Sequence, residues 1–245
     1  MEKVEKPPEK IRTGKDEIDN NYIEPDNQKR WLDLFEKENT DMSLLFETML
    51  LTGLRPEEAC GLKWKAFNVD ENKLVINNAY KSFNLYNDDM TKVIGHYSQD
   101  SSLKTPNSYR DVPILQERLR ETLLKHKQYQ QELFKKSRAI KNSHRKWTED
   151  EYIFLGRNYH PYIPDSLAYG LTKFRKKYGL TKKEDYVSPY GLRRSFASYW
   201  SWKGMKKVTL MHLMGHSNYE TTVQHYIKIS TKQIREEMQQ LEEAS

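Results

Sequence analysis

Residues 41–64 read DMSLLFETMLLTGLRPEEACGLKW, an apolar helix signal followed by a stop and a second helix start. Asp41 is a candidate N-cap, and the apolar run after it predicts a helix that ends at Gly53. Pro56 stands where the first position of a helix favours proline, so a short second helix begins there. This pattern places Arg55 at the head of the second helix, held between two rigid elements.

The segments on either side continue the helical pattern and then change period. A helix is expected over 28–38, and a long amphipathic helix over 115–136. The strings at 73–77 and 109–114 predict two strands. The polar segment between these strands predicts an extended hairpin or loop that contains Lys104.

Proline, glycine and capping residues mark the elements of the C-terminal half. These elements are a short strand at 152–154, helices at 165–179, 188–204 and 206–214, a helix that contains Tyr226 and opens with the capping box at 217–220, and a polar helix from Thr231. The fold class is therefore mainly α with a small antiparallel β-sheet (α+β). Residues 1–26 are expected to be a flexible leader or interdomain linker, because they are charged, carry three prolines and show little periodicity.

The charge of the chain favours a polyanionic partner. Lys and Arg number 41 against 35 Asp and Glu, a net charge of +6, and residues 171–207 alone hold eleven basic residues. Such a basic surface is typical of proteins that bind DNA. Cys60 is the only cysteine, so the chain forms no internal disulfide and no thiolate metal cluster. No apolar run approaches the ~20 residues that cross a bilayer, and a cytoplasmic protein without a membrane partner is expected.

Six side chains suited to phosphate chemistry lie, in chain order, within four distinctive strings. The strings are TGLRPEEACGLKW (52–64), KTPNSYRDVP (104–113), YGLRRSFA (190–197) and LMGHSNYETTVQHY (213–226). The residues that they contribute are Arg55, Lys104, Tyr190, Arg193, His216 and Tyr226. These strings, in this order and ending with a ten-residue step from His216 to Tyr226, resemble those of the tyrosine recombinases, particularly the integrases of phages and conjugative transposons.

The resemblance runs from residue 41 to residue 229 and implies a tyrosine recombinase catalytic domain over 27–230. It implies DNA recombination and integration by a mobile genetic element: one DNA strand is cleaved to a 3′-phosphotyrosine and religated to a new partner strand, without metal, cofactor or ATP. Implied partners are double-stranded DNA, further protomers in a synaptic multimer, and accessory DNA-bending or directionality factors. Residues 231–245 would form a tail that docks on a protomer.

The physical chemistry of these residues agrees with that activity. Attack on a phosphodiester builds charge on its non-bridging oxygens, which the planar donor forks of Arg55 and Arg193 can stabilise. The Tyr226 phenol would form the covalent intermediate. Lys104 would protonate the departing 5′-oxygen as a general acid. His216 would donate a hydrogen bond to the phosphate or help to position Tyr226.

Tyr190 departs from the family pattern, which commonly has a histidine three residues before the second arginine. A phenol has a reference pKa near 10 and is a poor base at neutral pH. We therefore expect Tyr190 to share a helical face with Arg193 and to donate a hydrogen bond to the phosphate. The role of proton acceptor is left open between water and His216.

Two other functions compete with recombination. A type IB topoisomerase would use the same chemistry to nick and reseal one duplex, and the strings around Arg55 and His216 argue against it. A catalytically inactive DNA-binding protein of the same fold is the second alternative, to which the departure at Tyr190 gives some room. Integrases of this kind usually carry upstream DNA-binding domains, and none is recognisable here. We therefore expect a fragment that binds its site weakly alone.

Overall fold

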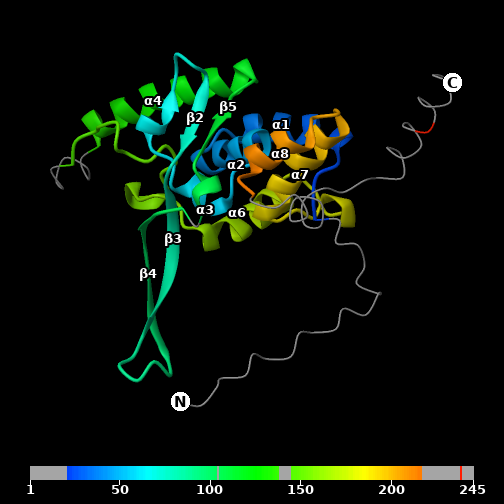
Figure 1. The fold of residues 1–245 in the computed structure, drawn as a ribbon. Coiled ribbons are helices and arrows are strands. Elements are labelled where there is room, and N and C mark those ends of the chain that lie inside the picture. The colour runs from blue at the N-terminus through cyan, green and yellow to red at the C-terminus, as the bar shows by residue number, and fades with distance from the viewer. Residues whose placement is uncertain (1–20, 104, 138–144, 217–237, 239–245) are drawn as a thin grey trace.

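The computed structural model describes residues 21–103, 105–137, 145–216 and 238 (Figure 1). The expected helix around Tyr226 and the polar helix from Thr231 lie outside these residues, except that Met238 is helical. Within the described ranges, none of the helices combines the length and the apolar character that a bilayer crossing requires.

The described body is mainly helical, as predicted. Its α-helices are α1 (Pro25–Glu38), α2 (Asp41–Thr52), α3 (Pro56–Cys60), α4 (Glu117–Lys136), α6 (Pro164–Lys177), α7 (Pro189–Trp202) and α8 (Lys207–Met214). Short 3-10 turns lie at Trp64–Ala66, Pro106–Ser108, Arg157–Tyr159 and Lys183–Asp185. Helices α1, α2, α7 and α8 gather at one end of the body, and α4 lies at the opposite end beside the sheet (Figure 1).

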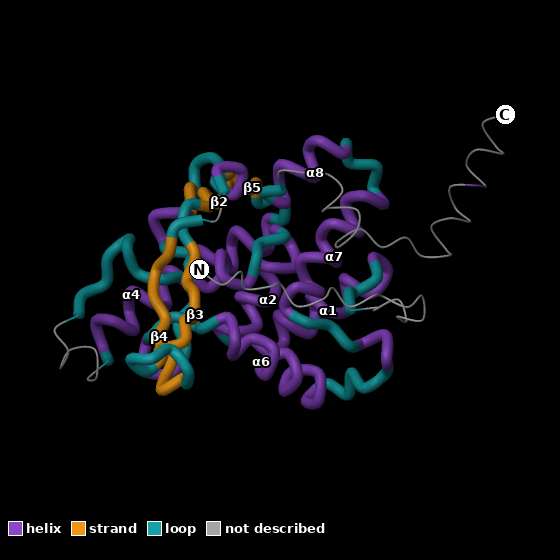
Figure 2. The backbone as a smooth tube through the Cα atoms, turned by 60° about the horizontal axis from the view of Figure 1, so that its bottom comes forward, coloured by secondary structure: helices purple, strands orange, loops and turns teal. Residues whose placement is uncertain are grey.

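The strands form two small antiparallel sheets rather than one. The first sheet has the order β1 (Phe67–Asn68), β2 (Lys73–Ile76) and β5 (Arg110–Pro113), with Leu74 opposite Val112. The second is a hairpin of β3 (Ala79–Tyr86) and β4 (Val93–Ser101), inserted between β2 and β5. The hairpin projects away from the helices (Figure 1), and its two strands run side by side (Figure 2). The strands predicted at 73–77 and 109–114 are thus confirmed, and of the two alternatives for the segment between them the described residues form the hairpin, over 79–101.

Helix α2 forms the centre of the core. Its run of buried residues from Ser43 to Leu50 leaves almost no face for solvent, as expected for a helix that is apolar all round. Helices α1, α3 and α7 pack against it. The helix ends at Gly53, whose positive φ of 66° closes the last turn through a hydrogen bond from its amide to the Met49 carbonyl. The stop at Gly53 and the start at Pro56 are therefore confirmed.

Two predictions about where elements begin need correction. The folded body begins before residue 27, because Tyr22 and Ile23 are buried and α1 starts at Pro25. The N-cap of α2 is Thr40 and not Asp41, because the Thr40 side chain accepts from the Ser43 amide and forms a capping box. Asp41 instead lies in the first turn of the helix, where an acid suits the dipole.

The strand predicted at 152–154 is not formed. Tyr152 makes only an isolated bridge to Lys63, and the Gln130 side chain of α4 donates to the carbonyls of Tyr152 and Ile153. Backbone groups that a strand would use in a ladder are thus satisfied by a neighbouring helix, which the local sequence does not reveal.

Gly53→Ala is expected to destabilise the protein by roughly 2–3 kcal/mol. A Cβ at Gly53 would lie 2.4 Å from the Phe196 ring of α7, in addition to the strain of a left-handed backbone. Gly179→Ala is the matched control, because Gly179 has φ +64° with nothing within 4 Å. That change should cost only about 1 kcal/mol in urea unfolding. Equal losses in the two variants would contradict the steric account.

Candidate functional site

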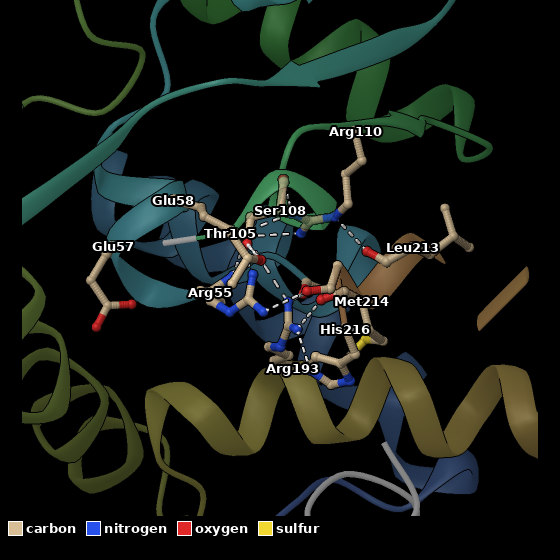
Figure 3. A network of polar contacts seen from close by, with 12 residues as sticks. Arg55, Glu57, Glu58, Thr105, Ser108, Arg110, Arg193, Leu213, Met214 and His216 are labelled. Atoms are coloured by element: carbon tan, nitrogen blue, oxygen red, sulfur yellow. Dashed lines mark hydrogen bonds and ion pairs between the residues drawn. The ribbon is translucent and has the colours of Figure 1, made fainter. Parts of the chain in front are cut away.

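Three arginines from separate elements converge on the C-terminal end of α8 (Figure 3). Arg55 comes from the head of α3, Arg110 from β5 and Arg193 from the first turns of α7. The strings that contain Arg55 and Arg193 lie far apart in the chain, and the fold brings both beside His216. We call these three arginines with Glu58 and His216 the arginine cluster.

The arginines satisfy the carbonyls at the end of α8. Arg110 Nε donates to the Leu213 carbonyl at 2.7 Å, and Arg193 Nη2 donates to the Met214 carbonyl. Arg55 Nη2 donates to the Gly215 carbonyl at 2.9 Å. The last carbonyls of a helix lack intrahelical partners and carry partial negative charge, so cations suit this position. The contacts therefore fix the turn that leads from α8 into His216.

The buried carboxylate of Glu58 contacts the arginines of the cluster. Its carboxylate accepts from Arg55 Nη1 at 2.6 Å and from Arg110 Nη1 and Nη2 at 3.1 and 2.8 Å, and Arg193 Nη1 lies 4.0 Å away. Burial opposes ionisation of Glu58, but Arg110, Arg193 and Arg55 outweigh it and lower the pKa to about 2. One buried carboxylate thus partly offsets three guanidinium charges.

Arg55 is the most accessible of the three arginines. The side chains of Arg110 and Arg193 are fully buried, whereas that of Arg55 is 24% exposed. Its backbone amide donates to Glu58 Oε2 at 2.9 Å, which holds the head of α3 in place. The three guanidinium charges exceed the single negative charge of Glu58, so the cluster is positive overall. An anion that approaches Arg55 therefore meets a preorganised positive site.

His216 is buried against this positive charge. Its Nε2 lies 2.9 Å from Arg193 Nη2, and the residue is 7% exposed. Burial, followed by the charges of Arg193, Arg55 and Arg110, lowers the pKa of His216 to about 3. At neutral pH the ring is neutral, so Nε2 accepts from Arg193 and Nδ1 carries the proton. A neutral ring with so low a pKa is a weak proton acceptor.

The His216 ring is expected to stay neutral from about pH 8 down to about pH 5. Its imidazole ¹⁵N shifts should remain constant over this range, since protonation would add a buried charge beside three guanidiniums. The His216→Asn spectrum assigns the resonances. A titration midpoint near the ordinary histidine value of about 6.5 would contradict the burial of the ring in the cluster.

Tyr190 contacts a different acid from the one in the cluster. Its hydroxyl donates to the two oxygens of Glu57, at 3.0 and 3.1 Å. Glu57 points away from the arginine cluster (Figure 3). Tyr190 is 40% exposed and Arg193 is fully buried, so the two side chains differ in environment although they stand three residues apart on α7.

Lys104 and Tyr226 lie outside the described residues. The neighbours of Lys104 in the chain are placed: Leu103 is buried in the core, and Thr105 lies beside the cluster (Figure 3). Sequence reasoning missed Glu58 as a partner of the arginines and Arg110 altogether. A signal for Arg110 was available, because it shares the inward face of β5 with Val112.

Among the residues that the structure places, no group of three or more His, Cys, Asp or Glu side chains could hold a metal ion. The cluster instead presents arginine donors, which are suited to an oxyanion such as a phosphate.

The fold is that of the catalytic domains of tyrosine recombinases. The integrase of transposon Tn1549, solved in complex with transposon right end DNA, superposes with a TM-score of 0.63 at 22% identity, covering 94% of this chain and 68% of that one. The XerA recombinase superposes with a TM-score of 0.61 at 20% identity, covering 89% and 64%.

The chain belongs to the phage integrase family, whose model matches residues 21–233. It is 27% identical over 225 residues to the transposase from transposon Tn916 of Enterococcus faecalis, which covers 88% of this chain and 50% of that protein. The ICEBs1 integrase of Bacillus subtilis is 27% identical over 205 residues, covering 84% and 50%. The chain thus spans about half the length of these curated relatives.

Proposed function

We propose that this chain is the catalytic domain of a site-specific DNA recombinase that integrates or excises a mobile element. The observation that carries the proposal is the arginine cluster, in which Arg55 and Arg193 converge beside His216 with Arg55 partly exposed. Such a fixed set of donors suits the charge that builds on a phosphate during attack. Family membership and the similarity to the Tn916 transposase support the same assignment.

In the proposed reaction, the Tyr226 hydroxyl attacks the scissile phosphorus and the bond to the 5′-oxygen breaks. The phenolic proton leaves to a water, because the low pKa of His216 disfavours that ring as the acceptor. Lys104 donates a proton to the 5′-oxygen, which leaves as a hydroxyl. Attack by the 5′-hydroxyl of a partner strand reverses these transfers and releases Tyr226.

Metal and ATP are not required in this proposal. The phosphotyrosine ester conserves the energy of the broken phosphodiester, so religation needs no further source. The arginines supply the charge stabilisation that a metal supplies in other phosphoryl-transfer sites. Tyr190 is assigned a hydrogen bond to the phosphate, for which its hydroxyl must leave Glu57.

The proposed partners are double-stranded DNA, other protomers in a synaptic multimer, and accessory DNA-bending or directionality factors. The integrase structures similar to this chain include complexes with DNA. Exposed lysines of α6, at the first residue of α8 and in the connections on either side of α7 suit contacts to the phosphate backbone: they are Lys173, Lys176, Lys177, Lys182, Lys203, Lys206 and Lys207. We propose that the domain predicted at 27–230, extended at its start to include Tyr22 and Ile23, carries this activity. The tail at 231–245 would dock on a protomer, and the protein would act in the bacterial cytoplasm.

Covalent capture of DNA tests the proposed function. Duplexes from the junctions of the encoding element are nicked near the scissile phosphate, so that the cleaved piece diffuses away. Incubation in EDTA without ATP is expected to give a protein–DNA band that resists denaturant. No band on any junction duplex that the protein binds would favour an inactive DNA-binding protein. Relaxation of supercoils without strand exchange would favour the topoisomerase alternative.

A further inference from the structure

The root of the β3–β4 hairpin is tied to the body of the domain through Asp100, a residue of β4. Its carboxylate accepts from Lys63 Nζ at 2.6 Å, from Asn78 Nδ2 at 2.8 Å and from the Tyr152 hydroxyl at 2.8 Å. These three donors come from three separate segments. The ammonium of Lys63 also lies 4.9 Å from the centre of the Tyr152 ring, so the same groups meet through a second contact.

The partners of Asp100 connect β4 to helix α3. Asn78 also donates to the carbonyl of Gly61, the C-cap of α3, at 3.1 Å. The backbone of β3 approaches Gly61 so closely that a Cβ there would lie 2.7 Å from the Tyr80 nitrogen. Since Arg55 stands at the other end of this short helix, Asp100 fixes the exit of the hairpin relative to the arginine cluster.

Contacts in the structure hold each of the three residues that follow Asp100. Lys81 Nζ donates to Ser101 Oγ at 3.0 Å and to the Ser102 carbonyl at 3.2 Å. Leu103 then enters the core, where it is 9% exposed. On the far side, Arg110 Nη1 holds the Ser108 carbonyl at 2.9 Å, close to Thr105. The described contacts thus control the chain on both sides of residue 104.

The surroundings of Asp100 favour the ionised form of its carboxyl group. Burial opposes its ionisation, but hydrogen bonds from Asn78, Lys63 and Tyr152 prevail and lower the pKa of the carboxyl. The Tyr152 phenol has a raised pKa, first through burial and then through its hydrogen bond to Asp100, and it remains a donor. A neutral amide at position 100 would lose the attraction to Lys63 and could not accept from all three donors.

We propose that Asp100 is a positioning residue for Lys104, holding the strand exit at the place from which the lysine reaches the leaving oxygen. This inference rests on the proposed function, in which Lys104 protonates the 5′-oxygen. It assigns to the hairpin root a part in catalysis that acts through Lys104 and not through contact with DNA.

The test uses two duplexes that differ in one atom. In the second, sulfur replaces the bridging 5′-oxygen at the scissile phosphate. A thiol has a reference pKa of about 8.5, so the sulfur leaves as a thiolate and needs no proton from a general acid. On the ordinary duplex, Asp100→Asn should slow cleavage about 10- to 100-fold, as expected from displacement of a general acid. On the sulfur duplex, its rate should approach that of the parent protein.

Two further variants decide the interpretation. Asp150→Asn is the matched control, because Asp150 is an exposed acid paired with Lys65 at 2.5 Å, and it should cleave both duplexes at the parent rate. Lys104→Ala should be slow on the ordinary duplex and rescued on the sulfur duplex. The inference would be overturned if Asp100→Asn cleaves both duplexes slowly, or if it cleaves both at the parent rate. Lys104→Ala without rescue would overturn the assigned role of Lys104 itself, independently of the result at Asp100.

Discussion

Tyr226→Phe is expected to abolish the covalent protein–DNA adduct, lowering its rate of formation by at least about four orders of magnitude. Phenylalanine keeps the ring and removes only the hydroxyl that would attack phosphorus. DNA binding should be retained, because it depends on lysine and arginine contacts to the backbone. Adduct formation is measured on nicked junction duplexes under denaturing conditions, and binding is measured in parallel by gel shift.

The control for this variant is Tyr219→Phe, seven residues earlier in the same string. It removes the same hydroxyl from a tyrosine to which the family resemblance assigns no role, and the adduct should form at the parent rate. An adduct that persists in Tyr226→Phe would show that another residue is the nucleophile and would contradict the assignment of that role to Tyr226. Loss in both variants would point to a general requirement of this string for folding or binding.

Most signals that lie within a few residues of one another predict the structure correctly, although the N-cap of α2 is Thr40 and not the neighbouring Asp41. Gly53 ends α2, Pro56 starts α3 and Ser188 caps α7, each through a preference of the residue for its own backbone position. The convergence of Arg55 and Arg193 beside His216 was expected from the family resemblance, and the described residues do lie together.

Interactions between distant segments were not predictable in this way. Glu58 was not identified as a site residue, because its main partner, Arg110, comes from β5. The strand expected at 152–154 fails because Gln130 of α4 takes its carbonyls. In both cases the partner stands tens of residues away, and no local pattern of charge or hydrophobicity identifies it.

Glu58→Gln is expected to destabilise the protein by about 3–5 kcal/mol at pH 7, because it leaves three guanidiniums without their shared carboxylate. Arg110 and Glu58 are both fully buried, so water cannot replace the lost charge. The free energy of unfolding is measured by urea titration. Glu57→Gln is the matched control: it alters the neighbouring residue of α3, whose carboxylate contacts Tyr190 outside the cluster, and should cost less than about 1 kcal/mol.

The stability difference between the parent protein and Glu58→Gln should also depend on pH. The folded pKa of Glu58 is about 2, below the ordinary value of about 4.3 expected in the unfolded chain. The carboxylate therefore stabilises the fold fully above about pH 5, and this contribution is lost as the pH falls through 4.3 toward 2. The free energies of unfolding of the parent protein and of Glu58→Gln should therefore approach each other as the pH falls. A constant difference from pH 7 to pH 3, or a loss no larger than that of Glu57→Gln, would show that the Glu58 charge does not hold the arginines together.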